Sequence, residues 1–138
     1  MVDAERLHRI LRRATDDLTT LQAYQRVDPQ ELALDPVRLG HVKYVFVTML
    51  EACLDAAHHV CAARGYGPVD TNAGAMLLLA QHYALTGELA AAMAQAVRFR
   101  NVLVHGYAQV DDRRVVAYLA ELDDVAAYLT AVTSLIRD

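Results

Sequence analysis

Eight consecutive residues in the last third of the chain bring together side chains that could act on a phosphate group. They are Arg100-Asn101-Val102-Leu103-Val104-His105-Gly106-Tyr107. Asn101 and His105 are four residues apart and therefore share one face of a helix. Arg100 is offset from Asn101 by about 100° around that helix and can reach the same space from the side. A guanidinium, an amide and an imidazole in this arrangement indicate phosphate chemistry.

These residue types match what RNA cleavage without a metal requires. A base must remove the proton of the ribose 2′-hydroxyl, an acid must protonate the leaving 5′-oxygen, and a cation or amide must stabilise charge on the phosphorus oxygens. His105 can serve as base or acid, and Arg100 offers a planar donor fork for phosphate. Asn101 can orient His105 or donate to phosphate, and Tyr107 can donate to phosphate or stack on a base. His105 also lies in the last turn of its predicted helix, where carbonyls stabilise an imidazolium.

One chain offers only one good proton carrier in this motif. Two copies related by a twofold axis would offer two histidines and two arginines, so the chemistry favours a homodimer. The structural alternative is that Arg100, Asn101 and His105 simply cap the helix end and pair with neighbouring carboxylates. Residue chemistry alone leaves both interpretations open.

Glycines, prolines and capping residues divide the chain into predicted helices that must position the motif. Apolar residues recur at spacings of three and four over about residues 4–25. Asp35-Pro36 is typical of a helix start, and this second helix continues to about residue 64, before Gly65. The second helix is apolar on most sides, which predicts a central or interface position.

A short third helix is predicted over about residues 72–84, with Asp70 or Asn72 as its cap. A fourth helix is predicted over about residues 87–105, with Thr86 as its cap. The reactive motif therefore lies at the C-terminal end of this fourth helix.

Gly106 occupies the position where a left-handed residue commonly ends a helix. Asp111 or Asp112 then caps one continuous last helix, whose apolar stripe reaches Leu135. No strand pattern is evident. We expect a single all-α domain over residues 1–138, an antiparallel bundle of four main helices plus one short helix.

Four further charged residues are candidates for supporting the site. Glu51 and Asp55 lie four residues apart on the otherwise apolar second helix. Buried carboxylates need partners, so they either join the site through Arg100 or another arginine, or form a structural salt bridge. Arg113 and Arg114 open the last helix near the motif. They either guide the RNA backbone or are ordinary solvated residues.

A metal or cofactor is not expected. Asp55-x-x-His58 has a spacing seen in di-iron bundles, but a second matching pair is absent from the sequence. Cys53 and Cys61 are eight residues apart in one predicted helix, about 12 Å, which is too far for a disulfide. Both are expected to be reduced, buried thiols.

The composition narrows the class of protein. Hydrophobic residues make up 55% of the chain, which suggests apolar surface available to a partner. No uninterrupted apolar run of about 18 residues occurs, so no membrane span is expected. The first residues lack the apolar core of a signal peptide, which predicts a cytoplasmic protein. The net charge of −4 argues mildly against nucleic-acid binding, although a local basic site can act within an acidic surface.

The motif resembles the signature of the HEPN superfamily, and closely that of the HepT toxins of HepT–MntA toxin–antitoxin pairs. The core signature is an arginine, four to six residues, then a histidine; here four residues separate Arg100 from His105, and Tyr107 follows. The resemblance covers about residues 4–136. It includes the run at 44–58, which is similar to the family's long central helix, and Val110-Asp111 before an amphipathic helix.

This resemblance implies a dimeric four-helix domain in which two motifs meet in a cleft. It implies a metal-independent endoribonuclease, and the reaction we expect is a transesterification that leaves a 2′,3′-cyclic phosphate. Arg100 and His105 would be catalytic, Asn101 would support them, and Tyr107 would receive AMP from a minimal nucleotidyltransferase antitoxin of the MntA type. The alternative is a non-catalytic HEPN subunit that binds such a nucleotidyltransferase, and an unrelated helical scaffold is the third reading.

Overall fold

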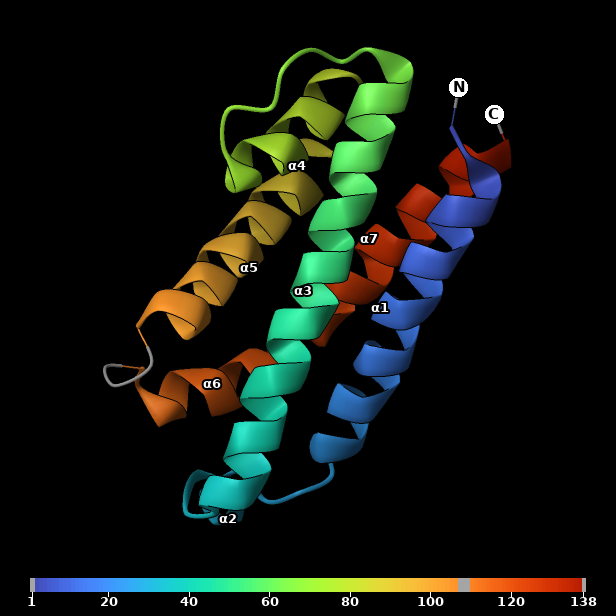
Figure 1. Ribbon diagram of the computed structural model, residues 1–138. Helices are drawn as coiled ribbons and strands as arrows, with labels where there is room; N and C mark the ends of the chain where they lie inside the picture. The colour runs from blue at the N-terminus through green and yellow to red at the C-terminus, as the bar shows by residue number, and fades with distance from the viewer. Residues whose placement is uncertain (1, 107–109, 138) are drawn as a thin grey trace.

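The computed structural model describes residues 2–106 and 110–137, and over these residues the chain is all-helical (Figure 1). Seven α-helices are present in the described parts, in chain order α1 (Ala4–Tyr24), α2 (Pro29–Ala33), α3 (Pro36–Arg64), α4 (Asn72–Gln81), α5 (Gly87–His105), α6 (Asp112–Tyr118) and α7 (Leu122–Ser134). Two 3-10 turns, at Leu119–Glu121 and Leu135–Arg137, follow α6 and α7. The predicted all-α class is confirmed.

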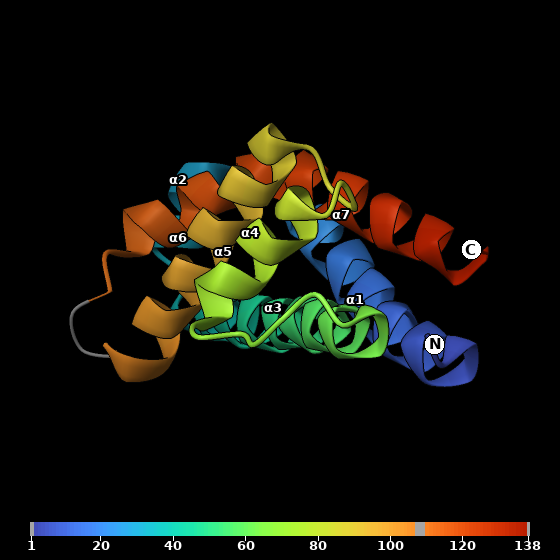
Figure 2. The same ribbon diagram turned by 90° about the horizontal axis from the view of Figure 1, so that it is seen from above.

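The long helix α3 is the centre of the arrangement. Helix α1 runs antiparallel beside it, α4 and α5 cover another side, and α7 packs against both α1 and α5 (Figures 1 and 2). The shorter helix α6 crosses near the C-terminal end of α5, and α2 closes the lower end of the molecule in Figure 1. The bundle therefore holds α5, which carries the reactive motif, against α3.

The start signals of the two main site helices, and the end signal of α3, behave as the sequence predicts. Asp35 accepts a hydrogen bond from the backbone N–H of Arg38, and Pro36 occupies the first turn of α3. Gly65 ends α3 in the left-handed region, with a φ of 64°. Thr86 accepts from the backbone N–H of Leu89 and begins α5.

One short helix was not predicted, and two predicted boundaries are wrong. Asp28 accepts from the N–H of Gln30 and starts the helix α2, in a segment for which no helix was predicted. The cap of α4 is Thr71, because its hydroxyl reaches the N–H of Gly74, and α4 ends earlier than predicted. The last helix is not continuous, because the 3-10 turn Leu119–Glu121 separates α6 from α7.

Helix α3 is long and apolar enough to cross a membrane by length and composition alone. However, 61% of its most apolar window is buried inside the bundle. Burial of this kind is typical of the central helix of a packed core, and it fits the predicted central position.

An aromatic cluster fixes the lower half of α5 against α3 and α6. The rings of Phe46 and Phe99 meet edge to face with centroids 5.5 Å apart. The ring of Tyr118 stacks on Phe99 at 4.2 Å with an interplanar angle of 8°. Phe46 and Phe99 are buried, so the helix that carries the motif has little freedom to rotate or slide.

Both cysteines are buried and free, as predicted. Burial, and to a lesser extent the charge of Asp17, raises the pKa of the Cys53 thiol from 9.0 to about 12. Burial also raises the pKa of the Cys61 thiol. Both thiols therefore stay protonated and unreactive at neutral pH in the folded protein.

The raised thiol pKa values predict a loss of stability in alkali. Above about pH 9 the thiols of the unfolded chain lose protons, whereas Cys53 in the folded chain keeps its proton up to about pH 12. The free energy of unfolding should therefore fall as pH rises from 9, by up to about 1.4 kcal/mol per pH unit for one thiol. Urea unfolding between pH 7 and pH 11 measures this slope. A Cys53→Ala variant should show a shallower slope, and an equal slope in both proteins would contradict the assignment.

Candidate functional site

Arg100 of α5 makes two polar contacts, one across to α3 and one with its neighbour on α5. Its Nη2 donates to Oε1 of Glu51 at 2.9 Å, and its Nη1 donates to Oδ1 of Asn101 at 3.0 Å. The side chain of Arg100 is 17% exposed and that of Glu51 is 41% exposed, so the ion pair lies at the edge of the core. The structure thus brings together three of the residues that the sequence singled out.

The Arg100 guanidinium retains donors beyond these two bonds. Arginine has five N–H donors in a fixed plane. The Nε of Arg100 is buried and has no hydrogen-bond partner among the described residues. The contacts with Glu51 and Asn101 also fix the orientation of the N–H groups on Nη1 and Nη2 that these two bonds do not use. A guanidinium held in one orientation with unused donors is suited to bind an oxyanion.

His105 is the last residue of α5, and it is exposed. Its imidazole has no hydrogen-bond partner within residues 2–106 and 110–137. Asn101, which contacts Arg100, lies one turn before it. The imidazole is therefore available to a substrate that contacts the end of α5.

Gly106 ends α5, but not in the predicted conformation. Its φ is −117°, outside the left-handed region, and its N–H donates to the carbonyl of Val102 at 2.8 Å. The need for glycine is steric instead, because a Cβ at this position would lie 2.9 Å from that Val102 oxygen. Tyr107 follows Gly106 and lies outside the described residues.

Asp55 and His58 lie near Arg100 but do not bond to it. With Glu51, Asn72 and Arg100 they line a hollow of about 230 Å³ between α3, α4 and α5. The neighbouring His59 accepts a hydrogen bond from the backbone N–H of Asp3 instead. Among the described residues no group of three or more histidines, cysteines and carboxylates could hold a metal ion.

The two arginines at the start of α6 have different surroundings. Arg113 donates to the Asp111 carboxylate, and this bond lowers the pKa of Asp111. Arg114 lies over the ring of Phe99, with its Cζ 5.6 Å from the ring centroid. Asp112, the first residue of α6, forms an ion pair with Lys43 of α3 at 2.8 Å.

Gln95 and Tyr118 are site candidates that sequence reasoning did not select. Both line a hollow of about 470 Å³ between α5 and α6, together with Arg98 and Arg114. Helical spacing could have indicated Gln95. It recurs with Arg98 and His105 at intervals of three and seven, which places all three on one face of α5.

Solved structures share this fold. A tri-AMPylated Shewanella oneidensis HEPN toxin in complex with MNT antitoxin matches with a TM-score of 0.86 and 21% identity, over 97% of this chain and 99% of that chain. A toxin–antitoxin structure with AMP-PNP matches with a TM-score of 0.84 and 21% identity, over 96% and 99%. A mutant MntA–HepT toxin–antitoxin structure also gives 0.84 and 21%, over 93% and 98%. Among curated proteins, none matches the chain by sequence.

The arrangement of helices is therefore shared with solved toxin structures, one of which is described as a HEPN toxin. The sequence pattern of the family described as "Ribonuclease HepT-like" matches residues 11–132. The chain belongs to this HepT-like ribonuclease family. The resemblance inferred from Arg100, His105 and Tyr107 is thereby confirmed at the level of the family.

Proposed function

We propose that this protein is a cytoplasmic endoribonuclease toxin that cuts RNA without a metal, using Arg100, Asn101 and His105. The observation that carries the proposal is the fixed Arg100 guanidinium, held by Glu51 and Asn101, less than two turns from an exposed His105 on α5. Membership of the HepT-like ribonuclease family supports the same reaction.

In the proposed reaction the ribose 2′-oxygen attacks phosphorus and the bond from phosphorus to the 5′-oxygen breaks. One imidazole accepts the 2′-hydroxyl proton, and a second donates a proton to the leaving 5′-oxygen. The products are a 2′,3′-cyclic phosphate and a free 5′-hydroxyl. Arg100 stabilises the added negative charge on the phosphorus oxygens, and Glu51 acts as a positioning residue that keeps the guanidinium in place.

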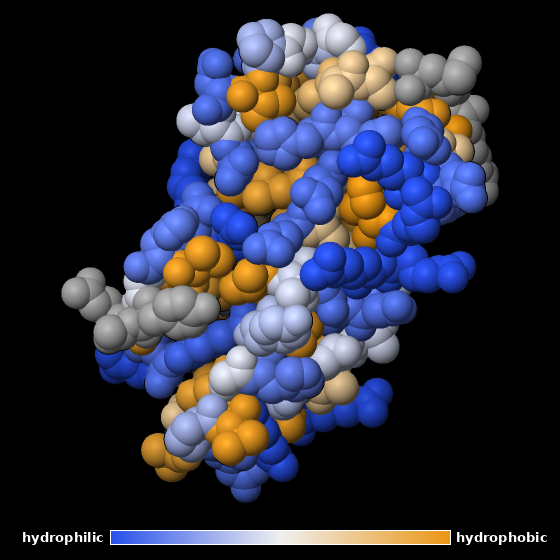
Figure 3. All heavy atoms as spheres, in the orientation of Figure 1, coloured by the Kyte–Doolittle hydropathy of each residue, from blue (hydrophilic) through white to orange (hydrophobic). Residues whose placement is uncertain are grey.

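A homodimer would supply the second imidazole, and apolar surface near the motif supports one. Val37 and Tyr44 on α3 are 83% and 66% exposed. A hollow of about 670 Å³ beside them is lined by Val47 and Leu103, and it also reaches Glu51. Figure 3 shows hydrophobic surface around α2 and beside the C-terminal end of α5. We propose that a second copy of the chain covers this surface.

Tyr44→Arg is expected to weaken that dimer. A large exposed ring at the centre of an interface commonly contributes 2 kcal/mol or more, so the dimer dissociation constant should rise about 30-fold. Sedimentation velocity over a range of chain concentrations measures it. Tyr83→Arg is the matched control, because Tyr83 is 95% exposed between α4 and α5. Equal dimerisation of the two variants would reject this face as the interface.

We propose that a minimal nucleotidyltransferase of the MntA type is the antitoxin, and that it attaches AMP to Tyr107. The relatives with this fold include a tri-AMPylated toxin bound to its MNT antitoxin partner chain. A nucleotide on Tyr107, seven residues after Arg100 in the sequence, would add negative charge and bulk to the motif and exclude RNA.

One experiment tests both the cleavage activity and its neutralisation by the proposed antitoxin. The protein is expressed alone and with the product of the adjacent gene, and both samples are assayed for RNA cleavage and intact mass. We expect growth arrest and cleavage from the protein alone, and added AMP with no cleavage after co-expression. Tyr107→Phe should remain unmodified and active. A harmless wild-type dimer that cleaves no RNA would instead support the non-catalytic binding subunit.

A further inference from the structure

We propose that the hollow between α5 and α6 binds the RNA strand beyond the phosphate that is cut, with Arg98 and Arg114 as donors to neighbouring phosphates of that strand. This inference rests on the proposed ribonuclease function and extends it to the path of the substrate. The hollow has a volume of about 470 Å³ and is lined by Gln95, Arg98, Arg114, Ala117, Tyr118 and Glu121.

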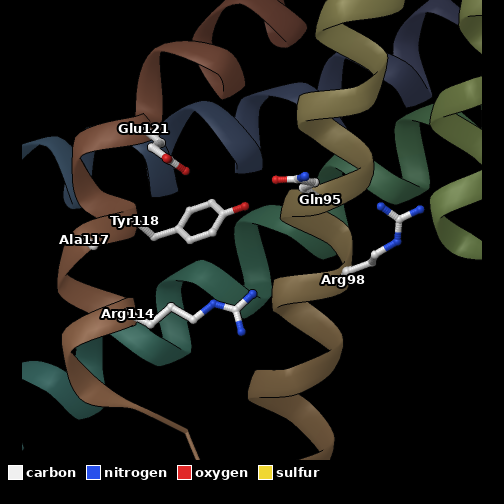
Figure 4. A pocket seen from close by; sticks show the side chains of 6 residues that line it. All are labelled: Gln95, Arg98, Arg114, Ala117, Tyr118 and Glu121. Atoms are coloured by element: carbon white, nitrogen blue, oxygen red, sulfur yellow. The ribbon is translucent and has the colours of Figure 1, made fainter.

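The side chains come from two helices that face each other across the hollow. Figure 4 shows Arg114 extending from α6 toward α5, and the hydroxyl of Tyr118 directed toward Gln95. Arg98 projects from α5 on the other side of the hollow, away from Arg114 (Figure 4). Two guanidinium groups that do not converge on one point suit neighbouring positions along an extended strand better than a single small anion.

Arg114 lies over an aromatic ring and keeps its donors. Its guanidinium lies over the buried ring of Phe99, and Phe99 in turn stacks on Tyr118. A cation over a ring is attracted to the face of that ring, so the in-plane N–H groups remain free to bind an oxyanion. Within the described residues neither Arg98 nor Arg114 forms an ion pair. Both charges are therefore available.

One face of α5 connects this hollow to the catalytic histidine. Gln95, Arg98, Val102 and His105 follow one another at spacings of three, four and three, which places them in one row along the helix. All four are exposed. Arg98 and His105 are seven residues apart, about 10 Å along the helix axis. A strand whose cut phosphate lies at His105 can therefore continue along this row to Arg98 and Arg114.

The charges in the hollow favour RNA over a simple anion. The whole chain carries a net charge of −4, so it does not attract polyanions everywhere. Two arginines that line the same hollow supply the local attraction, and the guanidinium fork matches phosphate oxygens. Glu121 at the edge of the hollow opposes a second anion there, but its carboxylate can accept a bond from a ribose hydroxyl. An acidic surface of the antitoxin is the competing occupant.

The test measures RNA binding separately from cleavage. His105→Ala is introduced into all proteins, and binding of a single-stranded RNA of about 12 nucleotides is followed by fluorescence anisotropy. Arg98→Gln and Arg114→Gln should each raise the dissociation constant about tenfold at low salt. Each should also lower the slope of log affinity against log salt by about 0.7. Arg114→Lys should keep the slope, because it keeps the charge.

Arg12→Gln is the matched control, since it removes the same charge from the exposed face of α1. If Arg98→Gln and Arg114→Gln bind RNA with the affinity and salt slope of Arg12→Gln, the phosphate site is wrong. Normal RNA binding combined with weaker binding of the antitoxin would also overturn it, in favour of a protein contact. If the wild-type protein binds RNA through these arginines but does not cut it, the ribonuclease proposal fails and the binding site stands.

Discussion

His105→Ala is expected to lower the rate constant of RNA cleavage by about 10²–10⁴-fold, the usual contribution of a general acid or base. The histidine is exposed in the last turn of α5, and none of its described neighbours bonds to it. Its removal should therefore leave the core and the thermal midpoint of unfolding unchanged. Single-turnover cleavage of a labelled RNA, with enzyme in excess, measures the chemical step directly.

His8→Ala provides the control for this experiment, because His8 is also exposed and lies on α1. It should cleave at the wild-type rate. A His105→Ala protein that cuts RNA within a few-fold of the wild-type rate would show that another group transfers the proton. His58, in the hollow beside Arg100, would then be the first residue to test.

Arg100→Ala is expected to lower the cleavage rate constant by about 10²–10³-fold, as for loss of one oxyanion donor. The guanidinium is the only cation in this motif that the structure fixes against a neighbouring helix, through Glu51. Arg100→Lys keeps the charge but loses the planar fork, so it should recover only part of the rate. Cleavage rates of the wild-type, Arg100→Ala and Arg100→Lys proteins measure the loss and its partial recovery. Urea unfolding curves of the same proteins measure any change in stability.

Substitutions of Glu51 distinguish a role in positioning the Arg100 guanidinium from a role in the stability of the fold alone. Glu51→Gln keeps an oxygen that can accept from Arg100 but removes the charge, whereas Glu51→Ala removes both. If Glu51 positions the guanidinium, cleavage should decrease in the order wild type, Glu51→Gln, Glu51→Ala, with the Michaelis constant less affected. Equal rates in the three proteins would show that Asn101 alone is sufficient to hold Arg100.

Helices long enough to show a period were predictable, whereas the five-residue helix α2 was not. Asp35-Pro36 was interpreted correctly because a long apolar pattern follows it. Asp28-Pro29 has the same chemistry, but α2 contains only five residues, Pro29–Ala33, too few for periodicity to be recognised. The break between α6 and α7 was also hidden, because a 3-10 turn at Leu119–Glu121 leaves the apolar spacing almost unchanged.

The site was predictable where it is local. The shared face of Asn101 and His105, and the lateral approach of Arg100, follow from helical spacing alone. The partner of Arg100 did not follow, because Glu51 lies 49 residues away and only tertiary packing selects it over Asp55. The hollow beside Arg98 and Arg114 likewise depends on how α6 crosses α5, which no local pattern determines.

If the proposed toxin role holds, the crowded backbone at Gly106 limits how the protein could escape its proposed antitoxin. Any side chain there would collide with the Val102 carbonyl and loosen the turn that carries His105. We therefore expect substitutions at Gly106 to impair killing as well as neutralisation. Resistant toxin mutants selected in the presence of the antitoxin should accumulate at Tyr107 or on the antitoxin-binding surface, and Gly106 should be missing from among them.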